Sequence, residues 1–347
     1  MNHKAKTVVI KVKKNVKTKP TVLDLFCGCG GLTKGLVNAG LDVIAGIDHF
    51  ERAVQSYDKN FNHLAICKDL TTYSPSMFSK AHNVGKGDVD ILVGGPPCQG
   101  FSQAGRRDQN DPRNSLFKEY VKYLEFFKPK AFLMENVLGI LSMKMANGVK
   151  AIDIIMAELN KNYNTIICKL YASDFEVPQN RRRVIIIGVR KDLGIVPTEP
   201  KTVCTLEQRK PVKSILVSKN EADKKLFLSE KAILGIKKKK EKSKAKGHGF
   251  GAQFLDLEKP AFTVPARAWK DGYENLMKYN DKEIRRMSVL ELKRIQSFPD
   301  DFILEGSRKD VIIQIGNAVP CKFAYWLGKH LLNTLQMPIA SKNPSSS

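Results

Sequence analysis

TVLDLFCGCGGLTKGLVNA, residues 21 to 39, joins an apolar β-type run to a helix-compatible segment through a loop that contains Gly28, Gly30 and Gly31. Glycines let the backbone and a ligand approach each other closely. Asp48 ends the next apolar run, where a carboxylate can accept hydrogen bonds from ribose hydroxyls. The stretch therefore indicates a nucleoside-binding α/β fold. The alternative is a glycine turn that only packs the strand against the helix.

The spacing of these glycines distinguishes between two kinds of nucleoside ligand. The pattern is G-x-G-G, and Thr33 occupies the place of the third glycine in the dinucleotide motif G-x-G-x-x-G. Dinucleotide binding is therefore disfavoured. A ligand such as S-adenosylmethionine has no phosphates and needs no phosphate cradle.

Strand and helix patterns alternate from residue 21 to about residue 191. This alternation is typical of an α/β sheet. Near-continuous apolar strands of this kind are covered by helices on both faces, so active residues should gather in loops at the carboxyl ends of the strands. The runs are TVLDLF (21–26), DVIAGI (42–47), VDILVG (89–94), KAFLME (130–135), TIICKLY (165–171) and RVIIIGV (183–189).

The pattern changes after residue 191, where Pro, Gly, Lys and short mixed runs predict a second, smaller domain. Helical patterns return at 287–298, where Ser288 can cap the N-terminus, and at 318–335. We expect both to rejoin the first domain. The predicted divisions are a basic N-terminal arm (1–20), a catalytic and cofactor-binding domain (21–191), the second domain (192–282) and a C-terminal segment that returns to the first domain (283–347).

The chain is strongly basic, with 58 Lys and Arg against 35 Asp and Glu and a formal net charge of +23. This excess predicts a polyanionic partner. Two Lys-rich stretches, 1–20 and 237–246, have the composition of disordered or loop-like segments. Each stretch either binds phosphates or is plain solvated surface, and the charge alone leaves both interpretations open.

The cysteine pattern and the hydropathy exclude several classes of protein. The seven cysteines are scattered and contain no C-x-x-C pair, which argues against a disulfide framework and against a metal site. No apolar run approaches the roughly 20 residues needed to span a bilayer, and the N-terminus lacks a signal-peptide core. We expect an intracellular protein with reduced thiols, no metal and no membrane partner.

Cys98 differs from the other cysteines because it lies in GGPPCQGFS, residues 94 to 102, directly after an apolar run. Two prolines stiffen the approach and glycines on both sides keep it open, which suits a thiol presented to a substrate. A free thiol has a pKa of about 8.5, so a nucleophile needs local help to become a thiolate. Alone, a cysteine here is more often a plain structural residue than a nucleophile, and the neighbouring motifs overturn that interpretation.

Two further motifs reach the same edge of the predicted sheet. Glu135 ends one apolar run, and Arg181, Arg182 and Arg183 lead into another. If a donor holds O2 of a pyrimidine and a carboxylic acid protonates or hydrogen-bonds N3, C6 becomes electrophilic and a cysteine can add to it. Thiol, carboxyl and guanidinium thus form a coherent set. Taken singly, Glu135 is equally a strand-end salt bridge, and the arginines are equally a phosphate-binding or solvated face.

Together these motifs resemble the DNA cytosine-5 methyltransferase family, over nearly the whole chain and in the family's order. The most specific are Pro-Pro-Cys-Gln at 96–99 and Gly-Asn-Ala-Val-Pro at 316–320. The resemblance implies a Rossmann-like, mostly parallel α/β sheet that uses S-adenosylmethionine, with a smaller target-recognition domain. The full set of motifs is DLFCGCGG, GID, KDL, GGPPCQGFS, ENV, QNRRR, RIQSFPDDF and QIGNAVP.

The resemblance also implies a role for each site residue. Cys98 would attack C6, Glu135 would hold N3 and the exocyclic amine, and Arg183 would bind O2, while Arg181 orders the loop around Cys98. No base for the C5 proton is assigned. Around the cofactor it implies Phe26, Gly28, Gly30, Gly31 and Asn317 at the methionine part, Asp48 at the ribose, Asp69 and Leu70 at the adenine, and Asp24 and Pro96 in the same pocket.

For the substrate, the resemblance implies double-stranded DNA with the target base flipped out of the helix. Residues 99–114 resemble the mobile loop that closes over the base, and 192–282 correspond to the target-recognition region. We expect a monomeric, stand-alone enzyme of the restriction-modification or viral type, cytoplasmic in a prokaryote or inside an infected cell. A cognate restriction endonuclease would act on the same site without binding it directly.

Two alternatives to a DNA methyltransferase remain. One branch of the family acts on transfer RNA, but its cysteine motif usually continues Pro-Phe-Thr after Gln, where this chain has Gly-Phe-Ser at 100–102. The other is a nucleic-acid-binding regulator that has lost catalysis. The intact Cys98, Glu135 and Arg183 argue against it, because a binding protein needs no nucleophile.

Overall fold

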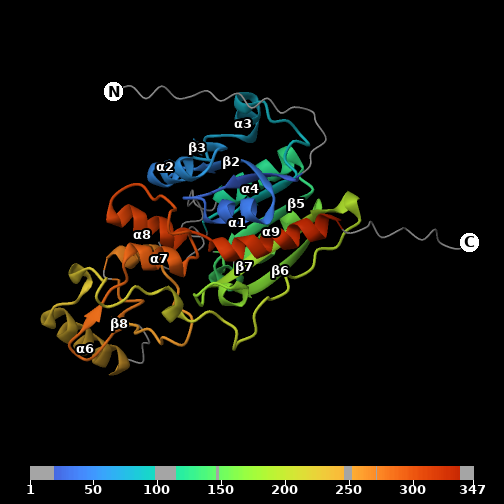
Figure 1. Cartoon of the computed structure of the whole chain (residues 1–347). Coiled ribbons are helices and arrows are strands. Elements are labelled where there is room, and N and C mark those ends of the chain that lie inside the picture. Colours follow the sequence, from blue (N-terminus) through green and yellow to red (C-terminus); the bar gives the residue numbers. More distant parts are fainter. Residues whose placement is uncertain (1–18, 98–114, 146–147, 246–251, 271, 337–347) are drawn as a thin grey trace, which may run out of the picture.

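The computed structural model describes residues 19–97, 115–145, 148–245, 252–270 and 272–336. Its centre is a seven-stranded sheet in the order β3-β2-β1-β4-β5-β7-β6, which confirms the predicted α/β class (Figure 1). The strands are β1 (Thr21–Leu25), β2 (Asp42–Asp48), β3 (Leu64–Cys67), β4 (Ile91–Gly94), β5 (Ala131–Asn136), β6 (Tyr163–Tyr171) and β7 (Arg182–Arg190).

The strand directions create one place in the sheet where a ligand crevice is expected. Strands β3, β2, β1, β4 and β5 are parallel, whereas β7 runs antiparallel between β5 and β6. The chain leaves β1 towards β2 and β3 and then returns to place β4 on the other side of β1. In open α/β sheets, ligands bind outside the carboxyl ends of the strands at such a reversal.

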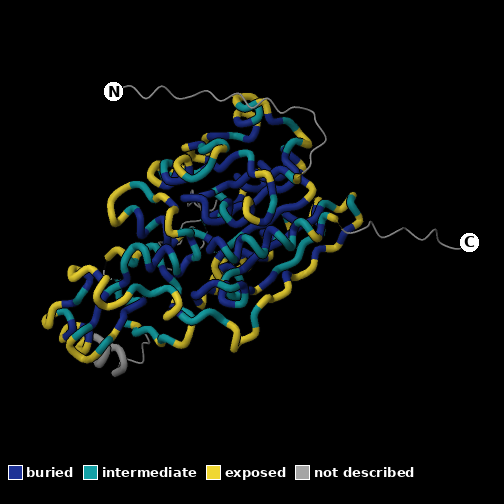
Figure 2. The backbone as a smooth tube through the Cα atoms, viewed as in Figure 1, coloured by how far each residue is buried: buried dark blue, intermediate teal, exposed yellow. Residues whose placement is uncertain are grey.

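Helices cover both faces of the sheet because strand side chains alternate between two apolar faces. One face packs on α3 (Pro75–His82), α4 (Ser115–Phe127) and α5 (Ala151–Leu159). The other packs on α1 (Gly31–Ala39) and α9 (Cys321–Gln336), and α2 (Glu51–Asn60) lies near the β3 edge (Figure 1). The strands between these helix layers are buried along most of their length (Figure 2).

The C-terminal helix α9 packs against the first helix, α1. Both helices contribute to the same apolar cluster on one face of the sheet. The contact is close because Gly35 of α1 has no side chain. A Cβ atom at Gly35 would lie 2.3 Å from Cβ of Ala324 in α9.

Away from the two faces of the sheet, a further apolar cluster joins residues of the predicted second domain to two later helices. It contains Val212, Ala261 and Val264 together with residues of α7 (Val289–Ile295) and α8 (Arg308–Asn317). α7 and α8 lie between the sheet and the region of α6 (Glu230–Ala245) and β8 (Met277–Lys278), which pairs with β9 (Ile284–Arg285) (Figure 1). The domain boundaries themselves stay a prediction.

Helix α7 begins where the sequence predicted. Ser288 accepts a hydrogen bond from the backbone N–H of Glu291, whose side chain accepts from the Ser288 N–H, so the helix starts with a capping box. Short 3-10 turns connect the remaining elements: η3 (Leu138–Leu141), η4 (Ala172–Phe175), η5 (Lys191–Leu193), η6 (Val212–Ile215), η7 (Lys224–Leu226) and η8 (Ala266–Trp269). None of the helices in the described ranges has both the length and the apolar character that crossing a membrane requires.

One prediction about the Lys-rich stretches was wrong. Residues 237–245, predicted to be loop-like, form the C-terminal part of helix α6. Lys and Ala are good helix formers, and lysines near a helix C-terminus interact favourably with the helix dipole. Composition typical of disorder is therefore also compatible with the end of a helix. Residues 1–18 of the basic arm and Lys246 lie outside the described residues.

Candidate active site

The glycine loop turns sharply between β1 and α1. Phe26, Gly28 and Gly30 have positive φ angles of 58°, 55° and 94°. Positive φ costs glycine little, whereas it is uncommon for a residue such as phenylalanine. A Cβ at Gly28 would meet nothing within 4 Å, so this side of the loop is open, whereas a Cβ at Gly30 would lie 2.3 Å from the Phe61 ring.

Asp48 fastens this loop to the end of β2. Its carboxylate accepts hydrogen bonds from the backbone N–H of Gly28 at 2.9 Å and of Phe50 at 2.8 Å. The side chain is 11% exposed. The sequence placed Asp48 beside a nucleoside ligand, and the structure places it directly under the open glycine. Its contact with a ribose stays a prediction.

Asp24 lies inside the core rather than on the open side of the loop. It has no exposed surface, and one carboxylate oxygen accepts a hydrogen bond from the Thr33 hydroxyl at 2.6 Å. The other oxygen has no hydrogen-bond partner among the described residues. Burial raises the pKa of Asp24 from 3.8 to about 7, because the charged form loses its hydration.

The Thr33 hydroxyl extends this contact towards the surface. It lies 3.1 Å from the Tyr57 hydroxyl, which in turn lies 2.7 Å from Nε2 of His63. A Cβ at Gly46 would lie 2.4 Å from the Tyr57 ring, so the missing side chain at Gly46 makes room for this ring. The base of the glycine loop is thus held by a connected set of polar groups.

The remaining predicted cofactor residues surround the same edge of the sheet. Asp69 follows β3, and its carboxylate accepts from the Thr71 N–H at 2.9 Å and the Thr71 hydroxyl at 2.8 Å, bonds that lower its pKa. Leu70 is buried. Asn317 is exposed at the end of α8, and a Cβ at Gly31 would lie 2.4 Å from the carbonyl oxygen of Val319. The segment after Asn317 therefore passes next to the glycine loop.

Glu135 and Arg183 meet at the carboxyl edge between β5 and β7. Glu135 Oε1 accepts a hydrogen bond from Arg183 Nε at 2.6 Å, and the two side chains are 12% and 11% exposed. The pairing depends on the reversed direction of β7, which places the start of β7 beside the end of β5, with Glu135 opposite Ile185. A parallel strand would have carried Arg183 to the other edge of the sheet.

The segment before Cys98 is fastened to the same edge. The carbonyl oxygen of Pro96, which is buried, accepts a hydrogen bond from Asn136 Nδ2 at 3.1 Å. A Cβ at Gly95 would lie 3.2 Å from Glu135 Oε2. Cys98 itself, and the predicted mobile loop at 99–114, lie outside the described residues. The described segment 19–97 therefore ends one residue before the predicted nucleophile. Its last residues include Gly95, which lies close to Glu135.

Arg181 has a different environment from Arg183. It is 2% exposed and donates to the carbonyl oxygens of Gly316 at 3.1 Å and Val264 at 3.4 Å. Burial, together with the nearby Arg183, lowers its pKa to about 9. Arg181 therefore joins three segments far apart in the sequence. Its predicted contact with the loop around Cys98 stays a prediction.

Two polar residues that sequence reasoning did not assign also hold this edge. Asn136 anchors Pro96, as described above. Gln179 is fully buried, accepts from the Val264 N–H at 3.0 Å and donates to Gln296 Oε1 at 2.9 Å. Asn136 belongs to the ENV motif and Gln179 to the QNRRR motif. Their position in these motifs was the signal from which a role at the site could have been inferred.

The sheet in which β7 runs antiparallel to both of its neighbours belongs to a fold that solved methyltransferases share. The crystal structure of the S. pombe Dnmt2 methyltransferase superposes with a TM-score of 0.70 at 21% sequence identity, covering 92% of this chain and 100% of that chain. At this identity the likeness shows the fold.

The chain belongs to the C-5 cytosine-specific DNA methylase family, whose model matches residues 20–333. It is 34% identical to the Type II methyltransferase M.FnuDI of Fusobacterium nucleatum over 90% of this chain and 94% of that protein. It is 46% identical to the Type II methyltransferase M.DdeI of Desulfomicrobium norvegicum over 49% of this chain, but the alignment spans only 41% of that protein. The predicted family is confirmed, and the protein is a DNA cytosine-5 methyltransferase.

Proposed function

We propose that this methyltransferase modifies cytosine within a specific sequence of double-stranded DNA, through a covalent bond between Cys98 and C6 of a flipped-out base. The observation that carries the proposal is the ion pair of Glu135 and Arg183, joined over 2.6 Å at the edge where the segment leading to Cys98 is anchored. A carboxyl and a guanidinium held together are the groups needed to polarise a pyrimidine. C6 is accessible to a thiol only when the base leaves the stack.

The family and the fold imply S-adenosylmethionine as the cofactor, and the residues present fit it. The space beside Gly28 is open, and Asp48, immediately below, is an acceptor suited to hydroxyl groups. When bound, S-adenosylmethionine supplies an electrophilic methyl group. We assign Phe26, Gly28, Gly30, Gly31 and Asn317 to its methionine part, Asp48 to the ribose, Asp69 and Leu70 to the adenine, and Pro96 and the buried Asp24 to support of the pocket.

The chemistry of the base follows from three side chains. The Cys98 thiolate adds to C6, which forms an S–C6 bond and moves the electron pair of the C5–C6 double bond to C5. Glu135 holds a proton at N3 and Arg183 donates to O2, so the developing charge is stabilised. C5 takes the methyl group of S-adenosylmethionine, and the electron pair of the broken S–CH3 bond stays on the sulfur, so that S-adenosylhomocysteine leaves. A base then removes the C5 proton, the C5–C6 double bond re-forms, and the S–C6 bond breaks to release the thiolate.

The wider setting is also part of the proposal. We assign residues 192–282 to target recognition, with side chains that read base edges. The name of M.FnuDI, a Type II methyltransferase, supports a restriction-modification setting. In that setting the enzyme acts as a monomer, and a cognate restriction endonuclease acts on the same site without binding it directly.

The proposal is tested by incubating the protein with varied duplex DNA and labelled S-adenosylmethionine, and by sequencing 5-methylcytosine in DNA from cells that express it. We expect methylation at one short sequence. Cys98→Ser should abolish methyl transfer while DNA binding persists, and Glu135→Gln should slow it by about 10²–10⁴-fold, the usual contribution of a general acid or base. Cys204→Ser, in the second domain, is the matched control and should be fully active.

Two results would replace the proposal with an alternative. Methyl transfer to transfer RNA, without transfer to duplex DNA, would indicate an RNA enzyme. Binding of DNA by the parent protein without any methylation across the duplexes would indicate a regulator. If Cys98→Ser retained activity, the covalent route would be wrong even if DNA were the substrate.

A further inference from the structure

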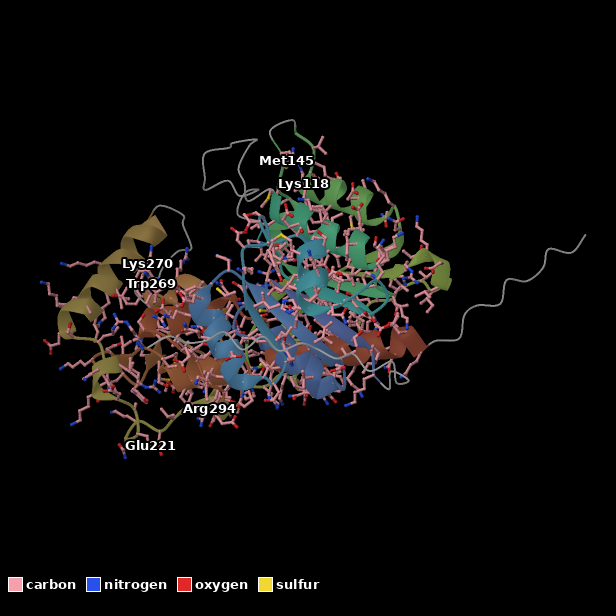
Figure 3. The ribbon with its side chains drawn as sticks, turned by 90° about the horizontal axis from the view of Figure 1, so that it is seen from above. Lys118, Met145, Glu221, Trp269, Lys270 and Arg294 are labelled. Carbon is pink, nitrogen blue, oxygen red and sulfur yellow. The ribbon has the colours of Figure 1, made fainter. Side chains whose placement is uncertain are left out.

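Two lysine side chains lie over the ring of an exposed tryptophan in the part of the chain that precedes α8. We call Trp269, Lys270 and Lys309, together with Arg308, which precedes Lys309 in α8, the Trp269 cluster. Trp269 is 38% exposed, and the ammonium groups of Lys309 and Lys270 lie 4.8 Å and 5.6 Å from the centre of its ring. Trp269 and Lys270 lie next to each other in the part of the molecule that holds α6 (Figure 3).

The cluster is joined to the catalytic edge through η8 and α8, which pack side by side. Trp269 ends η8 and contacts Lys309 in the first turn of α8. At the other end of both elements, a Cβ at Gly316 would lie 2.4 Å from the backbone nitrogen of Ala266. The carbonyl oxygen of Gly316 accepts the hydrogen bond from Arg181. The two helices therefore form one rigid arm between the cluster and the site.

The length of this arm follows from helix geometry. Lys309 and Gly316 are seven residues apart in α8, and an α-helix rises 1.5 Å per residue, so the cluster lies about 10 Å along α8 from Gly316. Each base pair adds about 3.4 Å to the length of a duplex, so a duplex bound at Glu135 and Arg183 is long enough to reach the cluster as well.

The charges of the cluster are only partly offset within the protein: hydrogen bonds from Ser307 and, after them, the charge of Lys309 lower the pKa of Asp310. Lys270, Arg308 and Lys309 form no ion pair with the described residues. Two neighbouring acids are already occupied: Glu274 pairs with Arg267 at 3.5 Å, and Asp310 caps α8 by accepting from Ser307. Cations in the first turn of a helix also lie at the positive end of its dipole, which is unfavourable. The cluster thus retains an excess of positive charge available to an external anion.

We propose that the Trp269 cluster is a clamp for the phosphate backbone of the duplex DNA that flanks the target cytosine. Trp269 holds the ammonium groups of Lys270 and Lys309 over its ring by cation–π attraction. Because the two lysine side chains are already ordered, they lose less conformational entropy when they bind phosphates. Phosphate contacts position a protein on DNA without reading its sequence. The clamp therefore sets the register of the duplex, and the inference rests on the proposed DNA substrate.

The test measures the salt dependence of binding to duplex DNA, without methyl transfer. Affinity for DNA falls when the salt concentration rises, and the logarithm of the affinity falls by about 0.9 per phosphate contact for each tenfold rise in salt. For each contact, a rise from 50 to 200 mM salt therefore reduces affinity by about 3.5-fold. We expect Lys270→Gln and Lys309→Gln each to reduce the salt-induced loss by about this factor, equally for cognate and unrelated duplexes. Trp269→Leu should weaken binding as well, whereas Lys80→Gln, on the opposite face at α3, should change nothing.

A second measurement locates the contact once the target cytosine is known. Duplexes with a single uncharged methylphosphonate are compared for the parent protein and Lys309→Gln. We expect the parent to lose affinity when the neutral group lies at one position that flanks the cytosine, and Lys309→Gln to be insensitive to the neutral group at that same position.

Three outcomes would overturn the clamp. They are a salt slope unchanged in both lysine variants, a loss confined to the cognate duplex, and a loss seen with RNA but not with DNA. Failure of the parent protein to methylate any duplex would instead contradict the proposed function, while the binding measurements would still report on the clamp.

Discussion

At the residue scale, Asp24 makes the stability of the protein depend on pH. Burial raises its pKa to about 7 from 3.8, so between these values the folded protein holds a proton that the unfolded chain has released. The stabilisation is complete below the unfolded pKa and is lost as the pH rises towards 7. We expect Asp24→Asn to remove this loss of stability at rising pH. The free energy that the parent loses should be on the order of a few kcal/mol, since one pKa unit corresponds to about 1.4 kcal/mol.

Urea unfolding at pH 5, 6, 7 and 8 measures this effect. The free energy of unfolding of Asp24→Asn, relative to the parent, should rise from pH 5 to pH 7 and level off between pH 7 and pH 8, above the folded pKa of Asp24. Asp58→Asn, at an exposed position of α2, is the matched control and should give a constant difference. If the two variants behaved alike, Asp24 would not be the group that titrates.

The sequence predicted one contact between site residues but not the partners of another site residue, and the catalytic roles of these residues stay predictions. Glu135 and Arg183 were predicted to meet at one edge, and the structure joins them. The partners of Arg181 could not be predicted, because Val264 and Gly316 lie 83 and 135 residues away and only the packed core brings them together. The burial of Asp24 follows from the packing of α1 and α2 on the strand, which periodicity alone does not specify.

At the element scale, a buried ion pair fixes the junction of β9 and α7. Arg285 and Glu291 have no exposed side-chain surface and form two hydrogen bonds of 2.8 Å each. Arg285 also donates to Tyr279, and Glu291 accepts from the N–H of Val217. Loss of one partner leaves a buried charge without compensation, which typically costs about 3–5 kcal/mol.

We therefore expect Glu291→Leu alone and Arg285→Met alone to lower the free energy of unfolding by about this amount, whereas the double variant should lose less than the sum. Chemical denaturation of the four proteins completes the cycle. Arg294 and Asp300, paired on the exposed surface at 2.6 Å, give the control cycle, with an expected coupling of at most about 1 kcal/mol. Equal coupling in both cycles would contradict the structural role of the buried pair.

The sequence predicted six of the seven strands of the sheet but missed β3 and the direction of β7, and each outcome has a physical reason. All six apolar runs are strands of the sheet, because fully buried strands leave a continuous apolar signal. β3 was missed since it has four residues, of which Cys67 is exposed. The reversed direction of β7 could not be predicted, because an apolar run carries no information about direction. That direction nevertheless brings Arg183 to Glu135.

At the scale of the whole molecule, the first and the last helix of the described chain, α1 and α9, pack against each other. Gly35 permits this contact, because a Cβ there would lie 2.4 Å from the carbonyl oxygen of Cys321 and 2.5 Å from the backbone nitrogen of Tyr325. The obstacle is backbone, which cannot rotate away as a side chain can. α1 also carries the end of the glycine loop, so the spacing of α1 and α9 bears directly on the cofactor pocket.

Replacement of glycine by alanine within a helix normally stabilises a protein by about 1 kcal/mol. At Gly35 we expect the opposite sign, a loss of about 1–3 kcal/mol from overpacking, together with weaker binding of S-adenosylmethionine. Gly235 in α6 is the matched control, since a Cβ there would meet nothing within 4 Å, and Gly235→Ala should be neutral or stabilising. Thermal unfolding of both variants, and calorimetric titration with S-adenosylmethionine, measure the two effects. Stabilisation by Gly35→Ala would mean that the helices can separate without cost, and that the C-terminal helix does not hold the glycine loop in place.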